Sequence, residues 1–491
     1  MIQNALTVIV PIKPGEVQNL RNLLTEIGDN IEKNIHLSWK ESPSTHFARF
    51  VILAPPSPSD PAGQNIPSLL GYPPRLLFTS NYDGTFEDYM RELVEKFGAD
   101  MENIWIKCQG YPAEAAKDPA KFTKFIYENS HLKSNAPPEA FYVACRGVSV
   151  QEMSQSTALC AAFNKLLDLP ETQQLGHRAP ALPRKSPVAC AASPAPPSGL
   201  SGLINKWVWQ AIFNLAEWVI GIRDGLNPNL PVTSPEMQLV VEDRVTQNQM
   251  TVIVPIRKDL KARILLPLVL KLINSVGGKT TGSLSGLTTI HFARWAIIDG
   301  GKNLFFESNY DGSWENYIDD FVDRAHFSMN IIWGNCENFP RGGCKDIEWF
   351  KKYIRDNQIP AQVFYSAYRN SSIKNNLNDL QVARALRRVL SPGDIESLLA
   401  GSYRLTQSTL EQLMSEPFLG LFLSGSYNRG VVLALNTPAQ TDPEDSGTEE
   451  AKSAAPEPDP KSAGAKKLAL PLLMIAGVSL LLLKLARRRN R

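Results

Sequence analysis

The chain has 491 residues, of which 43% are hydrophobic and 20% charged, so it is long enough for two or three domains with buried cores. Its 51 basic residues nearly balance its 49 acidic residues, which argues against bulk attraction to nucleic acid, and we expect no such partner. Six cysteines without metal-ligand spacing argue against a disulfide framework and a zinc site.

Residues 1–175 alternate between strand and helix patterns. Apolar residues recur at spacings of three and four in the helices and of two in the strands. In chain order we predict a strand at Thr7–Ile12, a helix at Glu16–Asn34, strands at His46–Leu53 and Leu76–Tyr82, a helix from Thr85, a helix at Phe122–Ser130 and a strand at Ala140–Cys145.

Two segments of different composition follow. Residues 176–202 are rich in proline, alanine and serine and predict a linker. Within residues 203–243, Leu203–Gly225 predicts an apolar helix with three tryptophans. That helix could dock on a neighbouring domain, or it could lie at a membrane interface, where tryptophan is common.

Residues 244–390 repeat the first segment. Leu76–Pro112 and Leu304–Pro340 align without a gap, 228 residues apart, with 15 of 37 positions identical. The sequence TVIVPI occurs in both copies, and HFARF returns as HFARW. In this copy we predict strands at Thr251–Ile256, His291–Ile298, Leu304–Tyr310 and Gln362–Tyr368, and helices at Leu260–Val276, from Ser313, and at Ile347–Asp356. The long period indicates a duplicated domain rather than a solenoid.

The order strand–helix–strand–strand–helix–strand is typical of ferredoxin-like domains. The fold class predicted is therefore α+β, with two tandem ferredoxin-like repeats. Such units commonly pair sheet against sheet, so we expect them to form an intrachain dimeric α+β barrel about a pseudo-twofold axis. Because the duplication supplies both halves, no oligomer is required.

The C-terminal part predicts a membrane tether. Residues 391–436 predict a helical extension, and residues 437–467 are acidic and proline-rich, as in disordered segments. Leu468–Ala486 is apolar enough to predict a transmembrane helix. The N-terminus has no signal-peptide pattern, so we expect a single-pass tail anchor with the globular part in the cytosol. The membrane would be a bacterial inner membrane, or in a eukaryote the mitochondrial outer membrane or the peroxisome.

Four chemically active positions occur in both copies and form the candidate site. They are His46 and His291, Arg49 and Arg294, Asp83 and Asp311 of the SNYDG turns, and Arg146 and Arg369. Strand alternation predicts that His46 and Arg49 point to opposite faces. Each position also has a structural interpretation: an aspartate that caps a helix, a buried hydrogen-bonded histidine, or an arginine in an ion pair.

The two predicted domains and the SNYDG turn resemble dye-decolourising peroxidases, which carry a GxxDG turn. That resemblance implies haem as cofactor. Asp83 or Asp311 would be the acid–base group, Arg49 or Arg294 the charge stabiliser, and His46 or His291 an iron ligand, with Arg146 and Arg369 also in the cofactor site. The HFAR motif is similar to that of single-domain dimeric α+β barrel proteins such as monooxygenase-like families.

Two other functions remain open. The chain could be a non-catalytic binding or scaffold module held at a membrane, in which the shared residues are caps and core pairs. It could also be a lipid-handling protein, with the tryptophan-rich helix and the anchor both placing it on the bilayer. The sequence does not identify a small-molecule ligand.

Overall fold

The computed structural model describes residues 2–31, 36–56, 63, 65–132, 139–172, 245–277, 284 and 287–423. The predicted linker, tryptophan-rich helix, tether and anchor lie outside these residues. Across the described ranges, no helix combines the length and apolar character needed to cross a membrane.

The chain has a mixed α+β architecture with two four-stranded antiparallel sheets, compatible with duplicated ferredoxin-like units. The strand orders are β1-β3-β2-β8 and β4-β6-β7-β5. The strands are β1 (Gln3–Pro11), β2 (Thr45–Leu53), β3 (Arg75–Asp83), β4 (Glu139–Val143), β5 (Gln247–Pro255), β6 (Ile290–Ile298), β7 (Asn303–Asp311) and β8 (Val363–Ser366). Every strand predicted from the sequence is present, with ends that differ by a few residues.

The two copies exchange their last strands. β8, from the second copy, pairs with β2 of the first, with Phe47 opposite Ser366. β4, from the first copy, pairs with β6 of the second, with Val143 opposite Phe292. The order of elements along the chain did not predict which sheet each last strand would join. Each sheet is completed by the other half of the chain.

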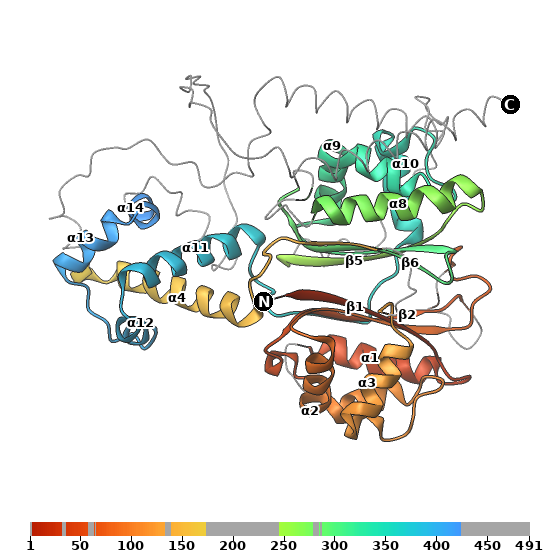
Figure 1. Cartoon of the computed structure of the whole chain (residues 1–491), viewed down its shortest axis with the longest axis horizontal. Helices are drawn as coiled ribbons and strands as arrows, with labels where there is room; N and C mark the ends of the chain where they lie inside the picture. The colour runs from red at the N-terminus through yellow and green to blue at the C-terminus, as the bar shows by residue number, and fades with distance from the viewer. Residues whose placement is uncertain are drawn as a thin grey trace, which may run out of the picture. The chain divides into compact units, whose positions relative to one another are not determined.

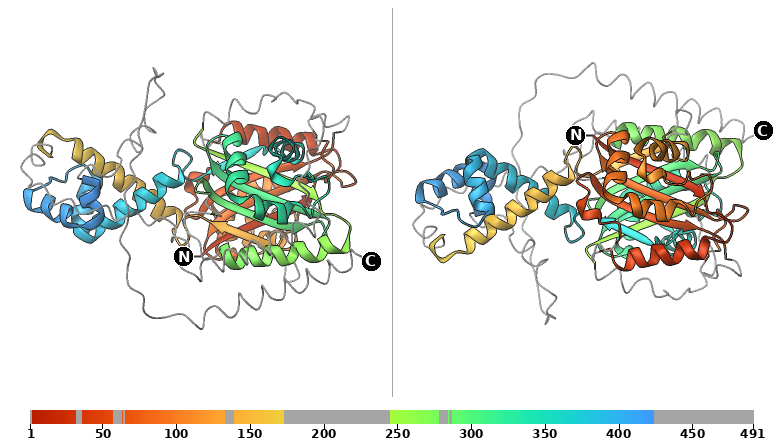
Figure 2. Two further views of the ribbon diagram at one scale, coloured as in Figure 1. Left: turned by 90° about the horizontal axis from the view of Figure 1, so that it is seen from above. Right: turned by 90° about the horizontal axis from the view of Figure 1, so that it is seen from below.

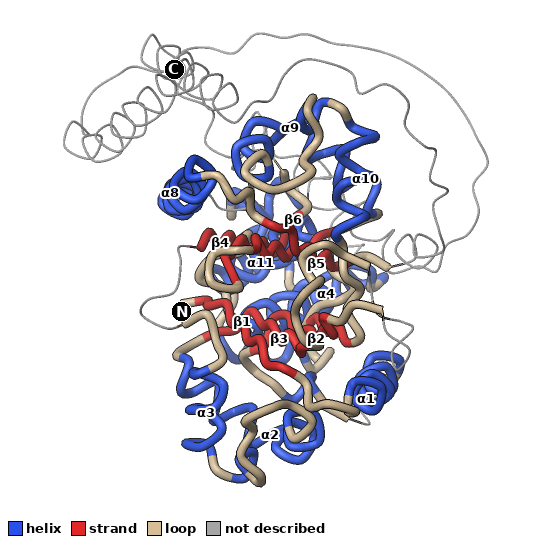
Figure 3. Tube along the Cα trace, turned by 90° about the vertical axis from the view of Figure 1, so that its right-hand side faces the viewer, coloured by secondary structure: helices blue, strands red, loops and turns tan. Residues whose placement is uncertain are grey.

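Helices cover the outer face of each sheet (Figure 1, Figure 3). They are α1 (Val17–Asp29), α2 (Phe86–Trp105) and α3 (Pro119–Glu128) on the first sheet, and α8 (Leu260–Gly277), α9 (Trp314–Trp333) and α10 (Ile347–Asn357) on the second. The exchanged strands are part of these layers, since α1 packs against β8 and α8 against β4.

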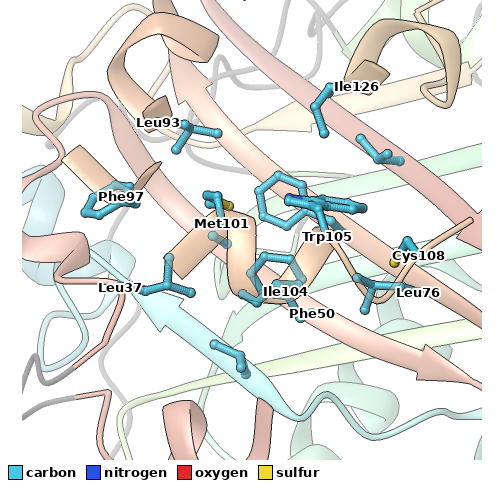
Figure 4. Close-up of a cluster of buried hydrophobic side chains, with 14 of the residues drawn as sticks. Leu37, Phe50, Leu76, Leu93, Phe97, Met101, Ile104, Trp105, Cys108 and Ile126 are labelled. Atoms are coloured by element: carbon cyan, nitrogen blue, oxygen red, sulfur yellow. The ribbon is translucent and has the colours of Figure 1, made fainter. Parts of the chain in front are cut away.

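The core of the first layer is centred on Trp105, at the end of α2 (Figure 4). Its ring lies 6.2 Å from that of Phe50 and 6.1 Å from that of Phe78, both on the sheet. Val363 and Tyr365 of the exchanged strand β8 belong to the same core. The apolar stripe of α2 is therefore buried against a sheet built from both copies.

The inner faces of the two sheets pack on each other. Val51 and Leu77 of the first sheet form one apolar cluster with Ile253, Ala296 and Phe305 of the second. Such a face-to-face contact needs alternate residues of each strand to point inward. That is why β2, β3, β6 and β7, which have a layer on both sides, are buried along almost their whole length.

A group of helices, here called the helical arm, lies beside one end of the sheets (Figure 1, Figure 2). It consists of α4 (Val150–Asp168), α11 (Ile373–Val389), α12 (Pro392–Leu399), α13 (Gln407–Ser415) and α14 (Pro417–Leu423). α4 and α11 follow the exchanged strands and pack against each other. Helices were predicted from the sequence in the extension after residue 390, whereas α4 and α11 were not. Their signal was a serine cap, Ser149 or Ser372, ahead of each helix.

Candidate functional site

The histidine of each HFAR motif lies on a β-bulge. The pairing of β2 with β3 shifts at His46, and that of β6 with β7 shifts at His291. Because a bulge adds one residue, it breaks the alternation of side chains along the strand. The ring of His46 lies 5.2 Å from that of Phe292 on the opposite sheet. The prediction that His46 and Arg49 point to opposite faces was therefore wrong, since both point toward the second sheet.

Each copy brings its histidine and its SNYDG aspartate together. Nε2 of His46 lies 3.1 Å from Oδ1 of Asp83, and Nε2 of His291 lies 2.7 Å from Oδ1 of Asp311. Both imidazoles are only 1% exposed, and the two carboxylates are 3% and 12% exposed. Two residues that are distant in sequence within each copy thus form one buried pair, and they do so twice.

The second oxygen of each aspartate caps a helix of the arm. Oδ2 of Asp83 accepts the backbone N–H of Val150 at 2.9 Å, and Oδ2 of Asp311 accepts that of Ile373 at 2.8 Å. These are the first residues of α4 and α11, where a carboxylate is favoured by the helix dipole. The helix that directly follows the SNYDG turn of the first copy, α2, is capped by Thr85 instead. Each aspartate therefore joins a strand to the helical arm.

The two histidines differ at their second nitrogen. Nδ1 of His46 lies 3.0 Å from the hydroxyl of Tyr368, whereas Nδ1 of His291 is buried without a hydrogen-bond partner. Tyr368 stands three residues after Tyr365, and the equivalent residue of the first copy is Cys145. Burial, above all, raises the pKa of Tyr368 well above its ordinary value. The hydroxyl therefore keeps its proton and can donate a hydrogen bond to Nδ1 of His46.

Arg49 crosses from the first sheet to the second and is fully enclosed there. Its side chain is 1% exposed, and burial lowers the pKa of its guanidinium while the charge of Glu307 opposes that shift. Arginine nevertheless stays protonated in proteins. Its two terminal nitrogens donate to Gln249 Oε1 at 3.1 Å, the Met250 carbonyl at 3.0 Å, Thr251 Oγ1 at 3.1 Å, the Ser308 carbonyl at 3.3 Å and Asn309 Oδ1.

Arg294 extends in the opposite direction, from the second sheet toward the first. Its side chain donates to Thr7 Oγ1 of the first sheet at 2.7 Å and pairs with Glu139 of the exchanged strand β4. Opposite it on β7 stands Glu307, which is 2% exposed and has one carboxylate oxygen without a hydrogen-bond partner. The two arginines therefore hold the sheets together and balance a buried carboxylate.

Equivalent residues of the two copies also meet directly. Nδ2 of Asn309 donates to Oδ1 of Asn81 at 3.0 Å, and these asparagines occupy the same position of the two SNYDG turns. Contact between equivalent residues is the mark of a twofold interface. Five residues of this region were not among the predicted site residues: Asn81, Asn309, Glu139, Glu307 and Tyr368. The repeated SNYDG motif was the signal for the first two.

The remaining shared arginines lie in the turns that lead into the helical arm. Arg146 is exposed in the turn before α4, and Arg369 is half-buried in the turn before α11. Of the eight predicted site residues, the structure brings each histidine to its aspartate and places the two interface arginines deeper between the sheets.

The geometry around the histidines does not fit haem ligation. An axial ligand needs one ring nitrogen free to face the iron. Both nitrogens of His46 are engaged, and its ring packs against Phe292 and Tyr368. His291 has a free Nδ1, but that atom is buried, and its ring packs against Phe47 and Tyr368. Among the described residues, no group of three or more metal-ligating side chains is present.

Comparison with known proteins gives no further information about this site. No protein-family model, curated protein or solved structure matches the chain.

A further buried carboxylate, that of Asp379, lies in the helical arm, and its titration predicts how the stability of the protein depends on pH. Burial is the main reason that the pKa of Asp379 is raised above its ordinary value of 3.8. Between the unfolded and folded pKa values the folded state binds more protons, so stability falls as pH rises through that window. We expect Asp379→Asn to raise the free energy of unfolding at pH 7, because a neutral amide avoids the cost of burying the ionised carboxylate.

Urea unfolding at several pH values between 3 and 8 tests this. The substitution should also remove the corresponding fall in stability with rising pH. Glu396→Gln, at an exposed position of α12, should leave the pH profile unchanged. A loss of stability in Asp379→Asn at pH 7 would show that the ionised carboxylate is favoured in the fold.

Proposed function

We propose that this chain is a membrane-tethered, non-catalytic scaffold or binding module. Its two ferredoxin-like units form an intrachain dimeric α+β barrel, and the helical arm is fixed to one end of it. The segment Leu468–Ala486 is the proposed anchor, with the barrel on the cytosolic side of the membrane.

One observation carries this proposal: the polar residues shared by the two copies are engaged in joining structural elements. Each SNYDG aspartate bonds a histidine with one oxygen and the first turn of an arm helix with the other. Each HFAR arginine spans the two sheets. A module that presents surfaces needs its parts held at fixed positions, and these contacts do that for the barrel and the arm.

The peroxidase-like oxidoreductase activity stays a prediction from the SNYDG turn. It would require a histidine nitrogen and an acid–base carboxylate that face a substrate. Here the carboxylates of Asp83 and Asp311 are each used twice within the protein. The contacts therefore favour the scaffold over the oxidoreductase.

The combined substitution Asp83→Asn with Asp311→Asn separates the two functions. An amide oxygen cannot replace both carboxylate oxygens, so each site loses one buried, charge-assisted hydrogen bond. The expected cost is about 2–4 kcal/mol of unfolding free energy in total. Binding of the full chain to lipid vesicles should be unchanged, as should its absorbance after haemin is added.

A matched variant controls for the loss of stability. Thr85→Ala with Ser313→Ala removes two helix caps away from the histidines, at about 1 kcal/mol each. The proposal fails if haemin gives the wild-type chain a Soret band and peroxide-dependent dye oxidation that the aspartate variant loses and the cap variant keeps.

A further inference from the structure

Helices α1 and α8 occupy equivalent places in the two copies, yet their outer faces differ. The half-buried apolar residues of α1, Val17 and Leu23, pack against the core, and its exposed residues are all polar: Gln18, Asn19, Asn22, Thr25, Glu26 and Asp29. On α8, Leu260 is 60% exposed, and Ile264, Pro267 and Leu268 are half-buried. These four residues lie at spacings of four, seven and eight, so they form one stripe on the helix. α8 thus has two apolar faces: one is buried against the sheet, and the other lies on the outer side of the helix.

The charge of α8 is of one sign. It contains Lys261, Arg263 and Lys271 and no acidic residue, and Lys302 lies on the adjoining turn between β6 and β7. None of these four cations pairs with a carboxylate among the described residues. In α1, by contrast, Arg21 is accompanied by Glu26 and Asp29. A helix that combines unpaired basic residues with an exposed apolar stripe is typical of membrane surfaces.

A cavity of about 460 Å³ opens between α8 and this turn. Its apolar lining includes Leu266 and Pro267 of α8 and Ile297 of β6, and Arg263 and Lys302 also line it. Pro267 has no N–H to donate to the carbonyl of Arg263, so that oxygen lacks its helical partner. The volume is within the usual range for small-ligand sites. Apolar walls with two cations suit a lipid whose headgroup is anionic.

We propose that the outer face of α8, together with Lys302, docks on an anionic lipid surface. This inference rests on the proposed membrane tether and adds which face of the barrel meets the bilayer. Residues 424–467, 44 in number, separate the last described helix from the proposed anchor. A random-coil linker of 44 residues would span about 35 Å on average, so a tether of that length would leave the barrel within reach of the membrane.

Charge explains why a bilayer is favoured over another apolar partner. The apolar stripe alone would suit any hydrophobic surface, but the four cations would then lose water without gaining a counter-charge. On an anionic bilayer the leucine and isoleucine side chains enter the interface while lysine and arginine extend to the phosphates. The polar face of α1 offers no such contact, so the barrel would dock by one side only.

Lysine acetylation of the full chain, read by mass spectrometry, tests the proposal with an internal reference. The chain is bound to vesicles of neutral phosphatidylcholine or of phosphatidylcholine with 30% phosphatidylserine. On the anionic vesicles we expect Lys271 and Lys302 to react at least about fivefold more slowly, the effect of one lysine–lipid contact. Lys96 of α2 and Lys124 of α3, both exposed on the other sheet's helices, should change less than twofold.

The variant Arg263→Ser with Lys302→Ser should return Lys271 to its rate on neutral vesicles. Both side chains are exposed, and a thermal melt checks the fold. The matched variant Lys96→Ser with Lys124→Ser should keep the protection. Flotation of the chain with neutral vesicles measures binding through the proposed anchor alone. A chain that does not float with them contradicts the tether, whereas a chain that floats but shows no lysine protection on anionic vesicles contradicts docking through α8.

Two results would contradict the proposal that α8 docks on the lipid surface. Equal reactivity of Lys271 and Lys302 on neutral and anionic vesicles would show that α8 does not meet the lipid. Slow reaction in the absence of vesicles would show that α8 is already covered by another part of the chain, such as the segment Leu203–Gly225.

Discussion

Gly28→Ala is expected to destabilise the protein by about 3 kcal/mol. A β-carbon at Gly28, in α1, would lie 2.1 Å from the carbonyl oxygen of Gln362, immediately before the exchanged strand β8. Both groups belong to packed backbone, so α1 would have to move away from the sheet. In an ordinary helix the same substitution would stabilise by about 0.5–1 kcal/mol. A loss of stability in Gly28→Ala, rather than a gain, would therefore show that α1 of the first copy packs against the backbone beside β8 of the second.

Gly393→Ala is the matched control for this prediction. Gly393 lies in α12, and no heavy atom outside its neighbours lies within 4 Å of a β-carbon built there. We expect that substitution to be neutral or mildly stabilising in urea unfolding followed by tryptophan fluorescence. If Gly28→Ala behaved like Gly393→Ala, α1 would not pack on β8, and the exchange of strands would be contradicted.

Apart from α4 and α11, the element order of the two copies was predictable because it depends on local patterns. The apolar spacing of α2 and the repeated TVIVPI and HFAR strands are each visible within a few residues. The pairing of the last strands was not predictable in this way. β4 has five residues and β8 has four, and a short apolar strand can pair with an edge of either sheet. The choice depends on three-dimensional contacts such as that between Gly28 and Gln362.

The candidate site was predictable in part. The duplication identified the histidines and aspartates, and the structure brings each pair together. Their orientation was not predictable, since the bulge at His46 leaves no residue signature and reverses the inferred face. The buried partners Glu307 and Tyr368 occur in one copy only. The equivalent residues, Thr79 and Cys145, have different chemistry, so the repeat could not identify them.

The second large effect is expected at Arg49. Arg49→Met should cost about 3–5 kcal/mol of unfolding free energy, because several buried acceptors lose a charge-assisted donor at once. Methionine fills much of the space but leaves the Met250 carbonyl and Asn309 without their donor, and it leaves Glu307 buried beside one cation fewer. Urea unfolding of the purified full chain measures the loss. Arg91→Met, at an exposed pair on α2, should have no measurable effect.

A double-mutant cycle separates the charge of Arg49 from its shape. Glu307→Gln removes the buried negative charge, so in the Arg49→Met background it should recover part of the loss, whereas alone it should destabilise. A coupling energy above about 1 kcal/mol between the two positions would confirm that they interact across the sheets. Additive losses would mean that Arg49 acts through its hydrogen bonds alone. Glu307 would then be balanced by Arg294, its neighbour across β6 and β7.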